Sequence, residues 1–124
     1  MLNETLLRAP RTDGRQELLR RGTRGAAELS VSRLRLAAGA TEDYVARDEE
    51  TVVVLQEGSG TFAAGARDWT VARRNVFEER ATALYLPPGA TLRVTAAAPL
   101  EAVLLSAATT EGGEPVLIGP DEVR

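Results

Sequence analysis

Apolar and polar residues alternate in short segments along most of this chain, and a period of two is typical of β-strands. The segment 29–36 (LSVSRLRL) alternates, but its apolar positions change parity between Val31 and Leu34, which indicates a bulge or a strand buried on both faces. The β-branched run 51–55 (TVVVL) is typical of a strand buried on both sides. Further strands are predicted at 66–71, 84–86, 91–96, 100–106 and 115–118.

Glycine and proline residues mark the expected turns. Gly58 and Gly60 interrupt the pattern after the TVVVL run and predict a hairpin that returns through Thr61 and Phe62. The run 87–89 (PPG) predicts a tight turn, because proline fixes φ and glycine supplies the unusual dihedral. Helical turns are suggested only at 4–7 and 17–21, and the phenylalanines at 62 and 77 are predicted to lie in the core. Seven or eight short strands favour a sandwich or a small barrel.

The length of 124 residues suits one domain with a core of its own. We expect a short N-terminal extension with an edge strand at 1–28, a barrel at 29–111 and an exit segment at 112–124. No apolar run approaches the roughly 20 residues that span a bilayer, and the first 15 residues lack the pattern of a secretory signal. The chain has no cysteine, so nothing depends on an oxidising compartment and a cytoplasmic location is expected.

Charge is distributed unevenly, because eight of the arginines and only four acids fall in the first 35 residues. This gives +4 there and −7 in the remainder, which sums to the net −3 of the chain. No aromatic residues that could stack on bases are interleaved with these arginines. We therefore interpret them as a solvated face or as partners of the acidic remainder, and predict no nucleic-acid or membrane partner.

The glycine and proline positions also match the spacing of two cupin motifs. The first motif runs G-x5-H-x-H-x3-E-x6-G, and Gly39 and Gly58 frame a segment of that length. The second motif centres on P-x-G-x2-H, and here Leu92 follows the PPG turn after two intervening residues. Together with the strand pattern, this spacing predicts an all-β, single-domain cupin-type barrel, that is, a double-stranded β-helix or jelly roll.

The positions that hold metal ligands in these motifs carry other side chains in this chain. The four slots contain Val45, Arg47, Thr51 and Leu92, and the whole sequence has no histidine. None of the four offers the imidazole or carboxylate that Zn, Fe or Mn requires. We therefore expect no metal and no other cofactor.

Several segments resemble the 5-deoxy-glucuronate isomerase family of inositol catabolism and the related 5-keto-4-deoxyuronate isomerases. They are 36–39 (LAAG), 52–58 (VVVLQEG), Trp69, 74–78 (RNVFE), 82–89 (TALYLPPG) and 94–96 (VTA), with a weaker likeness at 7–8 and 13–15. The chain departs from that family near 22–28, where RGTRGAA stands in place of an aromatic-containing stretch.

The resemblance implies a scaffold and leaves the activity open. That family is bicupin, about twice this length, and this chain resembles its N-terminal half. The family's metal ligands, three His and a Glu, lie in the C-terminal half, so no catalytic residue is carried over to this sequence.

The chain still offers groups that could bind or isomerise a sugar acid. Isomerisation needs a base that moves a proton and an electrophile that holds the enediolate oxygens. The candidate ligand-binding residues are Arg47, Tyr44, Glu78 and Tyr85. Arg47 in the lumen would hold a carboxylate bidentately, or alternatively it pairs outside with the acids at 48–50. Glu78 is otherwise an exposed hairpin acid, and Tyr85 is otherwise a packed strand residue.

Three functions remain open at this point. The first is a metal-free, non-catalytic cupin domain that serves in assembly or binds a small sugar acid. The second is an intramolecular sugar-acid isomerase, acting without metal or with a separate C-terminal cupin partner. The third is a small-molecule sensor. Continuous apolar strands in a half-length bicupin also predict a homodimer, because symmetric pairing would cover the apolar surface.

Overall fold

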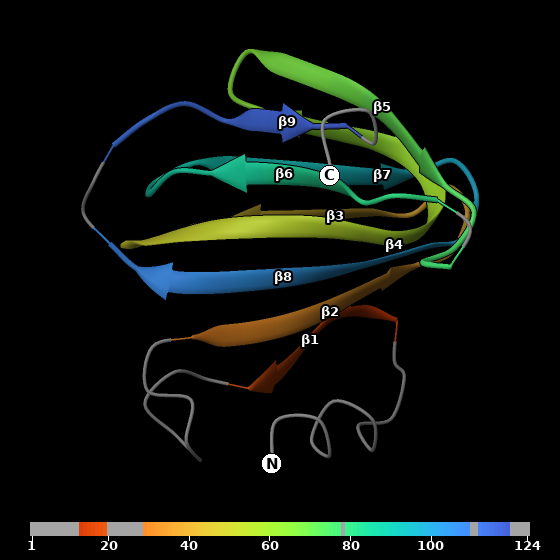
Figure 1. Ribbon diagram of the computed structural model, residues 1–124, viewed down its shortest axis with the longest axis horizontal. Coiled ribbons are helices and arrows are strands. Elements are labelled where there is room, and N and C mark those ends of the chain that lie inside the picture. The colour runs from red at the N-terminus through yellow and green to blue at the C-terminus, as the bar shows by residue number, and fades with distance from the viewer. Residues whose placement is uncertain (1–12, 20–28, 78, 110–111, 120–124) are drawn as a thin grey trace.

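The computed structural model describes residues 13–19, 29–77, 79–109 and 112–119, and these residues form β-strands and loops without a helix. The strands are β1 (Gly14–Leu19), β2 (Ser30–Leu36), β3 (Thr41–Val45), β4 (Glu49–Ala64), β5 (Arg67–Arg73), β6 (Thr82–Leu86), β7 (Thr91–Ala96), β8 (Leu100–Ala108) and β9 (Val116–Ile118). Figure 1 shows their arrangement, and the predicted all-β class is confirmed. No helix that could cross a membrane occurs in the described ranges.

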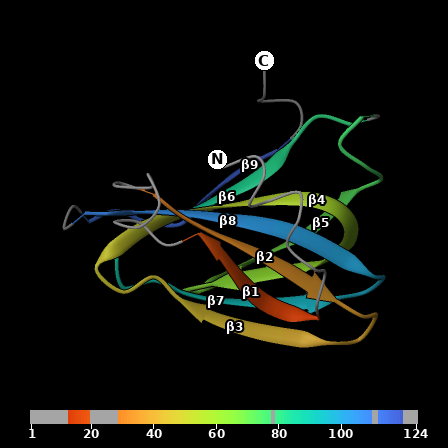
Figure 2. The ribbon, with the colours of Figure 1, turned by 90° about the horizontal axis from the view of Figure 1, so that it is seen from below.

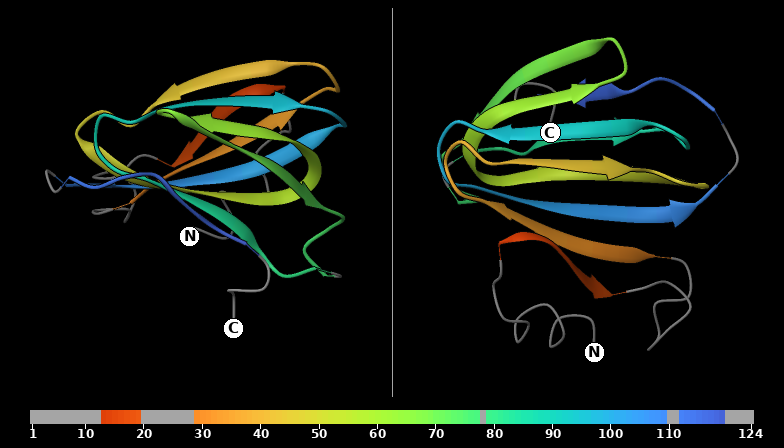
Figure 3. Two further views of the ribbon diagram at one scale, coloured as in Figure 1. Left: turned by 90° about the horizontal axis from the view of Figure 1, so that it is seen from above. Right: turned by 180° about the vertical axis from the view of Figure 1, so that it is seen from behind.

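The strands form two antiparallel layers that face each other. The first layer has the order β1-β2-β8-β4-β6-β9. The second layer contains β3, β7, the C-terminal half of β4, and β5. Figures 2 and 3 show the two layers edge-on and from behind, with β3 and β7 lying across from β2 and β8. Each layer therefore has an inner face toward the other layer and an outer face.

Strand β4 belongs to both layers, and here the predicted hairpin at 58–62 is wrong. The strand continues from Glu49 to Ala64 and bends at a register shift between Leu55 and Glu57. Gly58 has a φ of 107°, and a Cβ built on it would lie 2.3 Å from the carbonyl oxygen of Pro99. The glycines here allow close backbone approach where the strand changes layer, and they do not form a turn.

Three other features of the structure differ from the sequence-based expectations. Residues 17–19, expected in a helical turn, belong to β1, because Glu17 pairs with Ser32 of β2 and the ladder satisfies the backbone. Strand β3 was not predicted. Phe77, expected in the core, is 93% exposed in the loop between β5 and β6.

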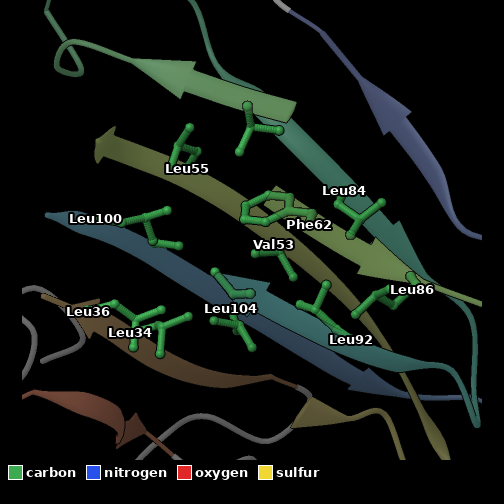
Figure 4. Close-up of a cluster of buried hydrophobic side chains, with 14 of the residues drawn as sticks. Leu34, Leu36, Val53, Leu55, Phe62, Leu84, Leu86, Leu92, Leu100 and Leu104 are labelled. Carbon is green, nitrogen blue, oxygen red and sulfur yellow. The ribbon is translucent and has the colours of Figure 1, made fainter. Parts of the chain in front are cut away.

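The inner faces carry the hydrophobic core. Alternate residues of the strands point inward, as in the pattern of β7, where Leu92, Val94 and Ala96 are buried and their neighbours are exposed. Figure 4 shows the core side chains converging between the layers from β2, β4, β6, β7 and β8. The PPG turn between β6 and β7 is confirmed: the amide of Ala90 donates to the carbonyl of Pro87, and Gly89 has a φ of 85°. At one end of the space between the layers, polar side chains, among them the buried Thr51 and Ser106, stand in place of apolar ones.

Candidate functional site

Four polar side chains form a hydrogen-bonded cluster at this polar end of the inner space. The hydroxyl of Tyr44 donates to Glu49 Oε1 at 2.8 Å. It also lies 2.9 Å from Thr51 Oγ1 and 3.1 Å from Ser106 Oγ. Thr51 and Ser106 are themselves 2.9 Å apart. The cluster therefore joins β3 of the second layer to β4 and β8 of the first.

The strand registers explain why these residues meet. Thr51 pairs directly with Ser106 across β4 and β8, and both side chains are buried on the inner face. Tyr44 pairs with the buried Leu92 across β3 and β7, so its side chain points in the same direction as Leu92, toward the first layer. Buried hydroxyl groups need partners, and here they supply them to one another.

Burial and neighbouring groups change the acidity of Tyr44. Burial raises the pKa of this phenol above its ordinary value of 10.0, because the charged form loses solvation. Hydrogen bonds with Ser106 and Thr51 lower the pKa, and the nearby Glu49 carboxylate raises it. The net shift is upward, so the phenol stays protonated at neutral pH and acts as a donor to Glu49.

Three members of the cluster, Tyr44, Glu49 and Ser106, form the floor of a cleft of about 430 Å³ between the open edges of the two layers. The cleft is lined by Arg15, Glu17, Ser30, Ser32, Tyr44, Val45, Arg47, Glu49 and Ser106. Its volume is within the range of small-molecule sites. Nearly all of its lining side chains carry a hydroxyl or a charge.

Two arginines stand at the wall and rim of the cleft. Arg15 donates from Nη1 to Ser32 Oγ at 2.8 Å, and its guanidinium carbon lies 5.5 Å from the centre of the Tyr44 ring. Arg47 is exposed in the turn between β3 and β4. The side chain of Arg47 makes no hydrogen bond or ion pair with the described residues, so the expected alternative of pairing with the acids at 48–50 is not seen there.

The inward positions at the end of β3 differ from those given by the motif spacing. The spacing places Val45 and Arg47 in the two histidine slots, yet Val45 is 39% exposed and Arg47 lies at the rim. Tyr44 and the fully buried Ala46 point inward instead. Packing of Tyr44 opposite Leu92 fixes the parity of β3, and one residue of shift moves every side chain to the other face. The other two slots, Thr51 and Leu92, do lie on the inner face.

The residues now in these positions do not fit the metal that a cupin motif implies. Tyr44, Ala46, Thr51 and Leu92 provide one protonated phenol, one hydroxyl and two apolar groups, whereas Zn, Fe and Mn sites use imidazole, carboxylate or thiolate donors. Within the described ranges, no three acidic or other metal-ligating side chains lie close enough together to hold a metal ion. We therefore derive no chemistry through a metal.

Two of the four predicted ligand-binding residues come together in this cleft, namely Tyr44 and Arg47. Tyr85 lies on the outer face of the first layer, where its hydroxyl donates to Glu50 Oε2 at 3.1 Å. Glu78 lies outside the described residues.

Sequence reasoning missed Arg15 and the serines at 30, 32 and 106 as cleft residues. The sequence contains one signal for them, because 30 and 32 are polar positions two apart within a strand and so share a face. The partner of that polar face, Tyr44, comes from a strand that the pattern did not reveal.

Comparison with known proteins now adds a family and a fold. The sequence model of the KduI/IolB family matches residues 6–124. Among curated proteins, none matches the sequence significantly. An IolB-like protein from Salmonella typhimurium LT2 has a similar structure, with a TM-score of 0.77 and 22% identity over 90% of this chain. This chain spans only 44% of the length of that protein.

Two further solved structures agree on the barrel. A cupin protein from Bacteroides fragilis has a TM-score of 0.61 and 18% identity, with 85% of this chain and 86% of that chain covered. The cupin domain of Cnp3 from Schizosaccharomyces pombe has a TM-score of 0.59 and 9% identity, with 77% and 60% covered. At these identities the likeness shows the fold, and the predicted cupin-type barrel is confirmed.

Proposed function

Because the chain belongs to the KduI/IolB family and folds as its cupin barrel, we propose that it is a metal-free, non-catalytic cupin domain that binds a small sugar acid in the cleft above Tyr44. The observation that carries this proposal is the combination of an arginine without a partner among the described residues and a floor of hydroxyl groups in one cleft. The family's isomerase activity is not part of the proposal.

The arginines suit the carboxylate of such a ligand. A guanidinium binds a carboxylate through two parallel hydrogen bonds, which adds both energy and orientation. Glu49 already accepts a hydrogen bond from Tyr44, and Glu17 also has an interaction within the chain. Arg47 has none with the described residues and is therefore the group most available to an anion.

The floor suits the hydroxyl groups of a sugar. Ser30, Ser32 and Ser106 each offer a hydroxyl that can donate or accept, and Tyr44 and Glu49 lie beside them. A polar wall of this kind would match a polyhydroxylated ligand better than an apolar one, because unpaired polar groups on either side are costly to bury. The cleft thus fits a carboxylate joined to a polyol.

The protonation state of the candidate base argues against catalysis in the cleft. The phenol of Tyr44 has a raised pKa and remains protonated at neutral pH, so it cannot remove a proton from a sugar carbon. Glu49, which accepts the hydrogen bond of that phenol, is held in a structural contact.

Calorimetric titration of the chain with glucuronate, galacturonate and uncharged glucose tests the proposal. We expect saturable binding of a uronate and no detectable binding of glucose. Arg47→Ala should weaken uronate binding about 10- to 100-fold, since a hydrogen bond to a charged group contributes about 1.5–3 kcal/mol. Arg67→Ala is the matched control, because Arg67 is equally an exposed arginine but stacks over Trp69 outside the cleft.

Two results would contradict the proposal. Absence of binding for every uronate would remove the ligand class, and equal weakening by Arg67→Ala would show a non-specific charge effect. If NMR shows that the chain alone converts a uronate to a ketose, that result would instead favour the alternative of an intramolecular isomerase.

A further inference from the structure

The cleft contains a second arginine, and its guanidinium group is held in place. Arg15 of β1 donates from Nη1 to Ser32 Oγ at 2.8 Å, and its guanidinium carbon lies 5.5 Å from the centre of the Tyr44 ring. A guanidinium has several N–H donors, so those not directed at Ser32 remain available to a ligand. Arg15 is therefore positioned before a ligand arrives, which lowers the entropy cost of binding.

The strand registers separate Arg15 and Arg47 along the cleft. Ser32, which holds Arg15, pairs with Leu104 of β8, whereas Glu49 pairs four residues further along the same strand. Four residues of a strand extend about 13 Å. Arg47 lies in the turn that precedes Glu49, and both arginines line the cleft. The two guanidinium groups thus approach the cleft from its two ends, and a single carboxylate is too small to reach both.

The acids of the cleft already have partners, whereas its arginines form no ion pair with the described residues. Glu49 accepts the hydrogen bond of Tyr44, and Glu17 also has an interaction within the chain. Among the described residues, Arg15 has its hydrogen bond to a serine hydroxyl and its contact with a ring, and both contacts leave its charge unpaired. A ligand with two anionic groups would therefore find a guanidinium for each of them.

We propose that Arg15 is a specificity-determining residue, through which the cleft selects a sugar acid with a second anionic group at the far end of its carbon chain. This inference rests on the proposed function, because it takes the cleft as the binding site of a sugar acid. One carboxylate binds Arg47, and the second anionic group binds Arg15 beside Tyr44. The hydroxyl groups of the carbon chain between them face the serines at 30 and 106.

Calorimetric titration with ligands that share a six-carbon skeleton tests the proposal. Glucarate has a carboxylate at both ends, 6-phosphogluconate has a carboxylate and a phosphate, and gluconate and glucuronate have one carboxylate each. We expect at least one of the two doubly anionic ligands to bind about 10-fold or more tightly than either monoacid, because a second charge-assisted contact is added. The tighter of the two identifies the second group as a carboxylate or a phosphate.

Arg15→Gln removes the second guanidinium charge. It should lower the affinity for the doubly anionic ligand to about that for gluconate, and it should leave both monoacids within about 3-fold, because they are held at Arg47. The matched control is Arg67→Gln, since Arg67 is likewise an exposed arginine over an aromatic ring, 5.0 Å from the centre of Trp69 and outside the cleft. The control should bind every ligand like the parent chain. Arg15 is exposed, so the fold should tolerate its replacement, and circular dichroism checks the strand content.

The outcomes separate this inference from the proposed function. If glucuronate binds but neither doubly anionic ligand binds more tightly, the second contact is wrong and the proposed function stands. Equal weakening of all the acids by Arg15→Gln would also overturn the inference, because a merely structural role lowers every affinity alike. If none of the acids binds, both proposals fail.

Discussion

Tyr44 is the residue that gives this barrel its polar end. Its ring continues the inward row of β3 opposite Leu92, while its hydroxyl reaches across to Thr51 and Ser106 of the other layer. The phenol therefore combines an apolar body in the core with a polar tip in the cleft. A leucine at this position would fill the space but leave buried hydroxyl groups with fewer partners.

The ionisation of Tyr44 gives a stability change at high pH. The native pKa of this phenol is raised, so the folded chain keeps its proton after the unfolded chain has lost it. This contribution is fully present below about pH 10 and is lost as the pH rises through the native pKa. The chain has no lysine or cysteine, so the tyrosines are the only side chains expected to titrate between about pH 9 and 12.

Two variants isolate this effect, because the chain has only two tyrosines. In Tyr85→Phe the remaining phenol should titrate above 10.0 by phenolate absorbance, and the free energy of unfolding in urea should fall above that pH. Tyr44→Phe should remove this fall. A titration midpoint of Tyr44 at or below 10.0 would contradict the burial argument.

At the scale of elements, β4 organises the barrel, because one strand pairs with four others. It contacts β6 and β8 in the first layer, then β5 and β7 in the second. Backbones come close together where β4 passes from the first layer to the second. Gly60 lies there, and a Cβ on it would be 2.1 Å from the carbonyl oxygen of Thr95. The close neighbour is backbone and cannot rotate away.

Gly60→Ala should therefore destabilise the fold strongly, by about 3 kcal/mol or more, since the ladder between β4 and β7 must shift. Gly60 has no positive φ, so the effect measures the close approach and not backbone strain. Gly112→Ala serves as the control, because a Cβ there meets nothing within 4 Å and its φ is also ordinary. Urea denaturation measures both. If Gly60→Ala lowered the free energy of unfolding as little as the control does, the backbones of β4 and β7 would be able to move apart freely at this point.

At the scale of the whole molecule, the cleft and the outward apolar residues of β4, β6, β8 and β9 lie on opposite faces of the same first layer. Thr51 and Ser106 point inward to the cleft, whereas Val52 and Leu105, their neighbours in sequence, point outward. The alternation of the strands separates the two surfaces, and sites without shared contacts act independently.

The double variant Val116→Glu, Ile118→Glu, which changes two partly exposed outward residues of β9, should therefore bind a uronate within about 3-fold of the parent chain, as calorimetry would show. Loss of uronate binding in the folded double variant would show that the outer face of the first layer is coupled to the cleft.

The sequence by itself determined the class of fold and much of its outline. Alternation in 29–36, the β-branched run after Thr51 and the PPG turn are local patterns, and they form two strands and a turn as predicted. Burial of the β-branched run on both faces is not seen, because Val53 is fully buried while Val52 and Val54 are only partly buried. The absence of histidine also settled which ligands the motif positions cannot offer. These features depend on side-chain type and on neighbours in the chain, so they can be read from the sequence.

Only the tertiary structure decided where the surfaces of the barrel meet. A glycine such as Gly58 is expected both in a turn and where two backbones approach each other closely. Only the position of Pro99 shows that the close approach applies here. The parity of β3 depends on Leu92, 48 residues beyond Tyr44, and a one-residue shift would place Val45 on the inner face instead of Tyr44. Likewise Arg15 joins the cleft through pairing of β1 with β2. Such long-range pairing selects among faces that the local sequence leaves equivalent, because a strand pattern fixes alternation but not direction.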